Sequence, residues 1–323
     1  MRISYSLGSL LTIEQVLECA KISEKYSPDT IWIPETWGME NFTMITSVSQ
    51  ENRYSKIGSS IINIFSRSPS LIAMGAVTVD TISNGRLIIG LGTSSETIVE
   101  NFHGNNFKKP VSRMKEYVEI IKLVLTGKKI NYDGSIFKLK NFNLMIKPKR
   151  NKIPIYLAAI NNKMVELTWD IADGVIFYLR PINEMKETIQ RMQSKRRIDV
   201  TSQLITCMNN DSDLACNRAK KTLAFYVAVG KVYRDFLANN GFKNETKNIF
   251  EEYLDNGLES LEEHVPDNMI KELTVCGTPL ECVKQIRNFT ECGIDLPIIQ
   301  FNPVNNVLDS FNLLTNTLSR ELN

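Results

Sequence analysis

The stretch Leu87-Ile88-Ile89-Gly90-Leu91 is apolar at every position. A strand with one face in water alternates apolar and polar residues, whereas a parallel strand covered on both faces shows an uninterrupted apolar run. The stretch therefore predicts a buried strand of a parallel sheet, with other elements packed over both of its faces.

Seven further short runs of similar character lie on either side of this stretch, and they alternate with segments of helical pattern. Such alternation is typical of βα units arranged around a parallel sheet. The eight predicted strands are Ile3–Leu7, Thr30–Pro34, Lys56–Ile62, Leu87–Leu91, Ile155–Ala159, Gly174–Tyr178, Ser202–Met208 and Leu296–Phe301.

Capping residues mark the starts of several helices between these strands. Thr12 and Gln15 have the spacing of a capping box, in which each side chain satisfies a free backbone amide. Ser68-Pro69 places a cap before a proline at the first helical position, and Thr278-Pro279-Leu280-Glu281 combines both devices.

Eight strands, each followed by helix, favour a closed barrel over an open doubly wound sheet. We therefore predict the α/β class and a (β/α)8 TIM barrel that forms a single domain over residues 1–323, with insertions at about 127–154 and 209–276. In the first insertion, Asp133-Gly134 between alternating residues predicts a hairpin. The second is charge-rich and helical, and Asn239-Asn240-Gly241 interrupts it.

The composition excludes several classes of protein. Lysine and arginine total 38 against 36 aspartates and glutamates, and this net charge of +2 argues against nucleic-acid binding by bulk electrostatics. No apolar run reaches the roughly 18–20 residues of a membrane span, so no membrane partner is expected. The N-terminus lacks the basic and then apolar build of a signal peptide, which favours a cytoplasmic protein.

Cysteine and histidine usage narrows the chemistry. The six cysteines contain no C-x-x-C pair, so neither a disulfide framework nor a zinc site is expected, and their scatter is typical of reduced, mostly buried thiols. The only histidines are His103 and His264, and the sequence has no G-x-S-x-G elbow. A histidine-rich metal site is excluded, a serine hydrolase is disfavoured, and we expect no metal.

The candidate site residues are those that follow the strands, because barrel active sites form at the carboxyl ends of the strands. Glu35-Thr36-Trp37 offers a carboxylate and a stacking face, and the alternative is a solvated acid beside a rim aromatic residue. The long segment Gly58–Pro69 contains Arg67, which either pairs with an anion or has a structural role. The basic run Lys147–Lys152 is interpreted as a solvated turn rather than as an anion patch.

Two further segments have the composition of phosphate-binding loops. Gly90–Glu96 combines paired glycines with hydroxyl groups, although Ser95 departs from the dinucleotide-binding fingerprint. Asn161, Asn162 and Lys163 stand at a predicted helix N-terminus, where free amides favour a phosphate. Asn161 as a simple N-cap is the alternative, and the two roles are compatible.

These motifs together resemble the bacterial luciferase-like superfamily, and within it the branch that uses the deazaflavin coenzyme F420 and includes methylenetetrahydromethanopterin reductase. The resemblance covers nearly the whole chain, and its strength lies in the order of the motifs rather than in any one of them. The matching segments are Ile31–Glu35, Ser66–Pro69, Asp80–Arg86, Gly90–Gly92, Ala172–Val175, Cys276–Pro279 and Gly293–Asp295.

The resemblance implies a flavin or deazaflavin bound at the carboxyl end of the barrel. It also implies a non-prolyl cis peptide in a bulge on the third strand behind the ring, and Ser60–Ile61 is the matching position. Glu35 and Thr36 match the ring-edge positions and are the candidate catalytic residues. The cofactor-binding residues implied by the resemblance are Ser6, Glu35, Ser60, Ile61, Asn63, Gly90, Leu91, Gly92, Thr93, Ala159, Asn161, Asn162 and Lys163.

Two departures from the family bear on the chemistry. Many relatives carry Asp-His where this chain has Glu35-Thr36, and the loss of that histidine argues against oxygen chemistry. The reductases carry an acid where Ser6 stands, which argues against a pterin substrate, although Glu35 is a candidate for the missing carboxylate.

Three functions follow, in order of preference. The first is an F420-dependent oxidoreductase that transfers a hydride between the deazaflavin and a small organic substrate. The second is an FMN-dependent luciferase-like monooxygenase, with FMN in place of F420. The third is a non-catalytic flavin-binding protein. Kinship also implies a homodimer or a homotetramer, and the sequence leaves the substrate undetermined.

Overall fold

The computed structural model describes residues 1–8 and 10–322, and in this part of the chain eight parallel strands close into a barrel. The predicted (β/α)8 fold is confirmed, and every predicted strand corresponds to a barrel strand. The barrel strands in order are β1 (Ser4–Ser6), β2 (Thr30–Ile33), β3 (Lys56–Ser59) with β4 (Ile62–Asn63), β5 (Leu87–Gly92), β8 (Ile155–Ala158), β9 (Gly174–Tyr178), β10 (Asp199–Met208) and β12 (Leu296–Phe301).

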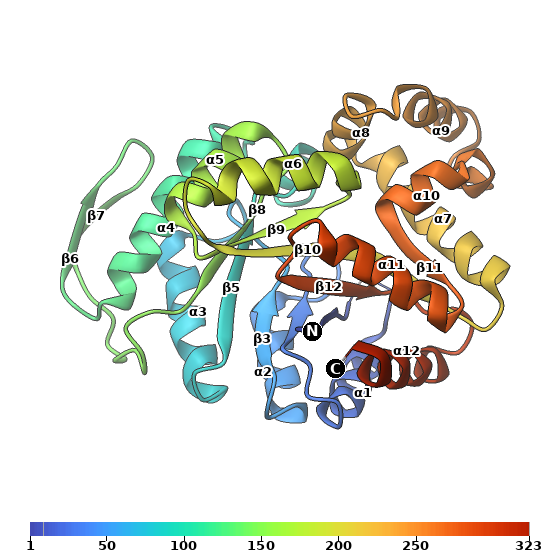
Figure 1. Ribbon diagram of the computed structural model, residues 1–323. Coiled ribbons are helices and arrows are strands. Elements are labelled where there is room, and N and C mark those ends of the chain that lie inside the picture. The colour runs from blue at the N-terminus through green and yellow to red at the C-terminus, as the bar shows by residue number, and fades with distance from the viewer. Residues whose placement is uncertain (9, 323) are drawn as a thin grey trace.

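The first and last strands close the barrel. Ser4 of β1 lies opposite Thr30 of β2 on one side and Ile298 of β12 on the other. β10 completes the ring between β9 and β12 (Figure 1). The two chain ends lie close together, and the terminal amino group of Met1 donates to the Leu322 carbonyl at 2.9 Å.

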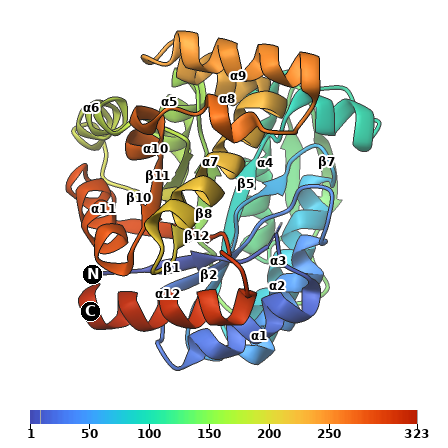
Figure 2. The same cartoon turned by 90° about the vertical axis from the view of Figure 1, so that its right-hand side faces the viewer.

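Helices surround the barrel, and Figure 2 shows α1 and α12 running side by side below its strands. The predicted capping boxes at Thr12 and Thr278 are present, and Ser68 caps the helix that begins with Pro69. The helices are α1 (Ile13–Glu24), α2 (Asn41–Glu51), α3 (Pro69–Ile82), α4 (Pro110–Leu125), α5 (Asn162–Ile171), α6 (Ile182–Gln193), α7 (Ser212–Val229), α8 (Lys231–Ala238), α9 (Lys243–Asn256), α10 (Asp267–Leu273), α11 (Pro279–Glu291) and α12 (Val307–Leu322).

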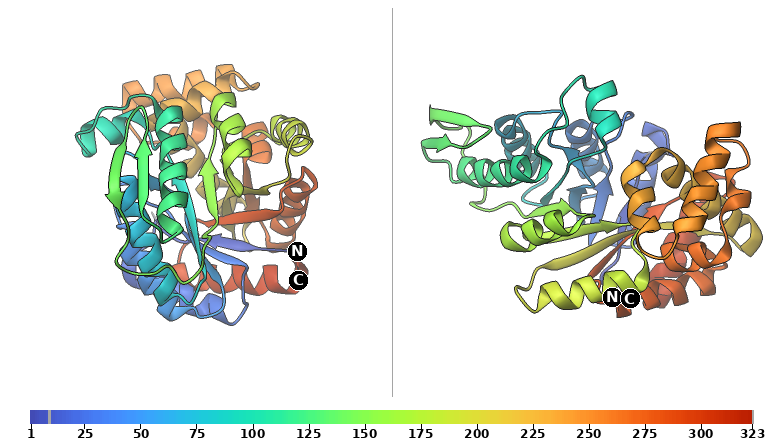
Figure 3. Two further views of the ribbon diagram at one scale, coloured as in Figure 1. Left: turned by 90° about the vertical axis from the view of Figure 1, so that its left-hand side faces the viewer. Right: turned by 90° about the horizontal axis from the view of Figure 1, so that it is seen from above.

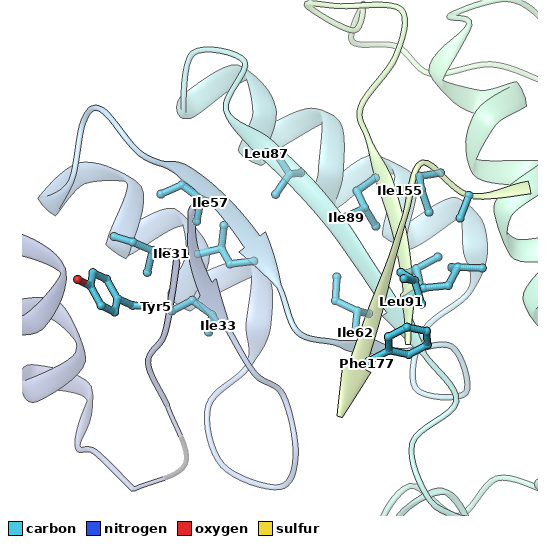
Figure 4. Close-up of a cluster of buried hydrophobic side chains, with 14 of the residues drawn as sticks. Tyr5, Ile31, Ile33, Ile57, Ile62, Leu87, Ile89, Leu91, Ile155 and Phe177 are labelled. Atoms are coloured by element: carbon cyan, nitrogen blue, oxygen red, sulfur yellow. The ribbon is translucent and has the colours of Figure 1, made fainter. Parts of the chain in front are cut away.

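The larger core lies between the strands and this helical layer. Figure 4 shows alternate strand residues, such as Ile31, Ile57, Ile89 and Leu91, which are buried on the outer face of the barrel. Burying a side chain of this kind stabilises the fold by about 1.5–3 kcal/mol relative to leaving it exposed. The intervening residues point inward, which explains why the strands are apolar throughout.

The inward-facing residues form a separate core inside the barrel. Its members are Trp32, Ile88, Tyr156, Ile176, Leu296 and Ile298, with the partly buried Ile61 packed against them. Gly58 leaves room for the Trp32 indole, because a Cβ built at Gly58 would stand 2.3 Å from that ring. The barrel interior is therefore filled with side chains below the carboxyl ends of the strands.

The first insertion forms the predicted hairpin, with β6 (Ile130–Asp133) antiparallel to β7 (Lys138–Phe142). It projects from the barrel on the side opposite α8 and α9 (Figures 1 and 3). Glu116 of α4 ties the hairpin to the barrel. Its carboxylate accepts hydrogen bonds from the backbone amides of Ser135, Ile136 and Phe137 and from the Ser135 hydroxyl, at 2.7–3.1 Å.

Glu116→Gln is expected to lower the free energy of unfolding by about 1–3 kcal/mol, because hydrogen bonds to a charged acceptor are replaced by weaker ones. Burial raises the pKa of the Glu116 carboxyl, but the hydrogen bonds from Ser135 and the backbone outweigh it and hold that pKa below its ordinary value. The stabilisation is therefore present above the ordinary carboxyl pKa and is lost as the pH falls through the lower folded value.

Urea unfolding of both proteins at neutral and at acidic pH tests this expectation. The difference between wild type and Glu116→Gln should shrink on acidification. Glu119→Gln is the matched control, because Glu119 on the same helix accepts a bond from the Tyr132 hydroxyl but is more exposed. An equal loss of stability in both variants would contradict the role given to Glu116.

The second insertion is helical, and it is interrupted as predicted between α8 and α9, where Gly241 has a positive φ of 98°. Its last residues differ from the expectation, because Thr274–Gly277 form strand β11 rather than helix. β11 pairs with the carboxyl half of β10 beyond the point where β9 ends. Because β10 extends past the end of β9, its backbone groups there are available to pair with β11.

The basic run Lys147–Lys152 makes intramolecular contacts. Arg150 forms an ion pair with the buried Asp80, and Lys152 pairs with Asp173. Its interpretation as a surface turn rather than an anion patch is in keeping with these pairings. No helix among the described residues is both long and apolar enough to cross a membrane.

Candidate active site

The third strand is interrupted at the carboxyl end of the barrel. β3 ends at Ser59 and β4 begins at Ile62, and the Ser60–Ile61 peptide between them is cis. The cis bond implied at this position by the family resemblance is thus confirmed. Because β4 continues the pairing with β5 through Ile62 and Leu91, the bulge lies within the barrel wall.

Two buried polar groups beside this bulge have no hydrogen-bond partner. The Ser60 hydroxyl and the Asn63 side-chain nitrogen are both shielded from solvent and unpaired. The Asn63 side-chain oxygen, in contrast, accepts a bond from the Phe65 amide at 2.9 Å, which fixes the orientation of the amide group. Leaving a buried donor unpaired costs about 1–3 kcal/mol, so a polar ligand at this point would recover that energy.

Glycine is required at two positions of β5 because atoms of the neighbouring bulge leave no room for a side chain. A Cβ at Gly90 would stand 1.8 Å from the Ser59 carbonyl oxygen, and one at Gly92 would stand 2.5 Å from the Ile61 side chain. Leu91 between them packs in the outer core, so its side chain lies away from the barrel interior (Figure 4). Thr93, which follows the strand, is partly exposed at the barrel mouth.

Glu35 is held by Arg67 beyond the carboxyl end of β2. The two guanidinium nitrogens of Arg67 donate to the two Glu35 oxygens at 2.8 and 2.6 Å, and Arg67 also contacts Glu40. The hydrogen bond with Glu35 is the main reason that the pKa of Arg67 is raised. Thr36, the other candidate catalytic residue, is partly exposed next to this ion pair.

Glu35→Gln is expected to lower the free energy of unfolding by about 1–3 kcal/mol, since it removes one partner of a largely buried, bidentate ion pair. Glu40→Gln is the matched control. Glu40 pairs with the same guanidinium, but its side chain is 47% exposed against 10% for Glu35. It also caps α2 by accepting from the Phe42 and Thr43 amides, and glutamine retains one acceptor oxygen for this cap, so a loss of only about 1 kcal/mol is expected. Urea unfolding measures both losses, and equal values would contradict the anchoring role of Glu35.

The predicted phosphate segment lies after β8. Asn161 caps α5 by accepting a bond from the Met164 amide at 3.1 Å, so its interpretation as an N-cap is confirmed. Asn161, Asn162 and Lys163 are all exposed at this helix N-terminus, whereas Ala159 is buried below them. Arg180, which follows β9, donates to the Ile160 carbonyl, and burial lowers its pKa to about 10.

Comparison with known proteins identifies the family to which the chain belongs. The sequence profile described as luciferase-like monooxygenase matches residues 2–296. The chain belongs to the luciferase-like monooxygenase family. This confirms the family resemblance inferred from the order of its motifs.

Within the luciferase-like family, the chain is 30% identical to a 5,10-methylenetetrahydromethanopterin reductase from Archaeoglobus fulgidus over 288 residues, or 85% of each chain. It is 26% identical to a putative coenzyme F420-dependent oxidoreductase from Mycobacterium tuberculosis over 321 residues, covering 90% of this chain and 92% of that protein. A coenzyme F420-dependent tetrahydromethanopterin reductase from Methanopyrus kandleri shares the fold, with a TM-score of 0.85 at 18% identity and coverage of 99% and 97%.

In this luciferase-like barrel, the mouth also contains residues that the sequence did not single out. Tyr178 ends β9 on the same face as Ile176 of the inner core, and the rings of Tyr226 and Tyr233 pack edge-on against it at 5.1 and 5.5 Å. Burial raises the pKa of the Tyr178 hydroxyl, so this group is a protonated phenol. The second insertion supplies Tyr226 and Tyr233, so only the fold brings the three rings together.

Proposed function

We propose that this protein is a coenzyme F420-dependent oxidoreductase that transfers a hydride between the deazaflavin and a small organic substrate. The observation that carries the proposal is the pair of buried, unpartnered polar groups, the Ser60 hydroxyl and the Asn63 amide nitrogen, beside the cis peptide of the third strand. The Mycobacterium tuberculosis relative that is named for coenzyme F420 supports the choice of cofactor.

The residues present fit a planar ring with heteroatoms along one edge. The apolar side chain of Ile61, which covers Gly92, is proposed to back the ring together with Thr93, and Ser60 and Asn63 provide unpaired groups for its edge. The deazaflavin, when bound, supplies the hydride chemistry, and the protein supplies orientation and electrostatics.

Further roles follow from position in the barrel. Glu35 and Thr36 are proposed to face the ring edge, with Glu35 acting as a carboxylate, because both of its oxygens accept from Arg67. Ser6 at the end of β1, with Gly90, Leu91 and Ala159, completes the wall through side chain or backbone. Asn161, Asn162 and Lys163 are proposed to receive the cofactor phosphate at the N-terminus of α5.

We also infer a cytoplasmic protein that acts as a homodimer or a homotetramer. All six cysteines are free thiols, which suits a reducing compartment. Several large apolar side chains are exposed, among them Leu71 and Met74 on α3 and Phe142 on the hairpin. Light scattering after size-exclusion chromatography measures the mass, and a monomer at micromolar concentration would contradict the assembly.

Competitive titration with F420 and FMN tests the proposed cofactor. The absorption and fluorescence of each cofactor report binding, and F420 is expected to bind at least tenfold more tightly, a difference of about 1.4 kcal/mol. Tight binding of FMN with none of F420 would overturn the proposal. If reduced FMN and substrate then consumed oxygen, the FMN-dependent monooxygenase would take its place.

A second measurement separates an enzyme from a binding protein. Reduced F420 is mixed with a panel of small carbonyl and imine compounds, and oxidation of the cofactor is followed by the return of its absorption. Turnover with at least one compound is expected. Tight F420 binding without turnover, unchanged in Glu35→Ala, would favour the non-catalytic flavin-binding protein.

A further inference from the structure

Four of the six cysteines gather in one region of the fold, although they are scattered along the sequence. They are Cys207 on β10, Cys216 on α7, Cys276 on β11 and Cys282 on α11. The Cys216 and Cys276 sulfurs are 2.9 Å apart, whereas the Cys282 sulfur contacts the backbone carbonyls of Cys207 and Gly277. One pair of thiols is thus set apart from the other two.

The backbone around Cys276 is fixed. Its amide donates to the Gln285 side chain at 2.9 Å, its carbonyl accepts from the same side chain at 2.8 Å, and β11 pairs with β10 on its other side. Cys276 is buried, with 3% of its surface exposed. The backbone of Cys276 is therefore held in place, and its partner Cys216 lies near the start of α7.

Cys216 is the reactive partner of the pair. It is only partly buried, so a small reagent in solution reaches it before it reaches Cys276. The hydrogen bond with the Cys276 thiol lowers the pKa of Cys216, whereas burial raises the pKa of Cys207 to about 12. Because the thiolate is the nucleophile, Cys216 is expected to react first among the four cysteines.

We propose that Cys216 and Cys276 form an oxidative modification site, a dithiol that a small disulfide in solution converts to an intramolecular disulfide. A disulfide bond is about 2.05 Å long, so the sulfurs need to approach by less than about 1 Å.

The reaction balances with a small disulfide as the oxidant. The Cys216 thiolate attacks one sulfur of the reagent, the reagent bond breaks, and the first small thiol leaves. The Cys276 thiol then loses its proton and attacks the Cys216 sulfur, which releases the second small thiol. The protein loses two electrons and two protons, and the reagent is reduced to two thiols.

The bond would join helix α7 to strand β11, two elements of the second insertion. α7 also carries Tyr226, whose ring packs against Tyr178 at the barrel mouth. A crosslink between residues 216 and 276 closes a long loop of the chain, and such crosslinks restrict the unfolded state. We expect the oxidised protein to unfold about 5 °C above the reduced protein.

Oxidised glutathione serves as the probe, with the full-length protein. After incubation and acid quenching, intact mass spectrometry is expected to show a loss of two hydrogen atoms. Peptide mapping is expected to show one crosslinked peptide that contains residues 216 and 276. Dithiothreitol is expected to reverse both changes.

Single substitutions test the separate roles of the two thiols. Cys276→Ser should trap a stable glutathione adduct on Cys216, because the second thiol is missing. In Cys216→Ser, Cys276 should react at least tenfold more slowly than Cys216 reacts in the wild type. Cys292→Ser is the control on a remote cysteine and should form the crosslink as the wild type does. A wild type that keeps all thiols, or a crosslink through Cys207 or Cys282, would overturn the proposal.

Discussion

Replacing Gly90 by alanine should lower the free energy of unfolding by about 3–5 kcal/mol, the largest stability effect that we expect from a single methyl group in this chain. The new Cβ would stand 1.8 Å from the Ser59 carbonyl oxygen, which is backbone. The backbone has little freedom to retreat, because the Ser59 hydroxyl donates to the Gly90 carbonyl at 2.8 Å and accepts from the Gly90 amide at 2.7 Å.

Gly38→Ala is the matched control for this substitution. No atom lies within 4 Å of a Cβ built at Gly38, and its φ lies outside the left-handed region. A change within about 0.5 kcal/mol is therefore expected. Chemical denaturation of both variants measures the two effects. If Gly90→Ala were as stable as Gly38→Ala, the Ser59 carbonyl would have to lie farther from Gly90 than it does in the structure.

Gly90 and Gly92 also show how much of the structure could be predicted from the sequence alone. Paired glycines after an apolar strand suggested room for a ligand, whereas the structure shows that the Ser59 carbonyl and the Ile61 side chain occupy the space that side chains on Gly90 and Gly92 would need. The barrel itself was predictable, since burial on both faces of a strand leaves an uninterrupted apolar run such as Leu87–Leu91.

What the sequence could not show are contacts between distant segments. Cys216 and Cys276 are 60 residues apart, and the ring of Tyr178 on β9 contacts that of Tyr226 on α7 only in the folded chain. The ion pair between Glu35 and Arg67 was equally hidden, although both residues were candidates separately. No local sequence pattern predicts such contacts, because they form only when segments that are distant in the sequence pack together.

Replacing Asn63 by aspartate should weaken F420 binding by about 10–100-fold, or about 1.4–2.7 kcal/mol. The exchange keeps the side-chain oxygen that accepts from the Phe65 amide and replaces the unpartnered nitrogen with a second oxygen. A group that we propose to donate to the cofactor would become one that repels its acceptor atoms. The bulge between β3 and β4 keeps its local hydrogen bond, but the new carboxylate is buried without a partner, so a loss of stability is expected beside the loss of binding.

Asn52→Asp makes the same exchange at the other end of β3 and serves as the control. The Asn52 nitrogen already donates to the Ala20 carbonyl and the Ser23 hydroxyl, so its loss should cost about 2–3 kcal/mol of stability and leave F420 affinity unchanged. Urea unfolding should therefore show a loss of stability in both variants, whereas fluorescence titration should show a loss of F420 affinity in Asn63→Asp alone. Wild-type affinity in Asn63→Asp would show that this amide does not face the cofactor and would remove the observation on which the proposed function rests.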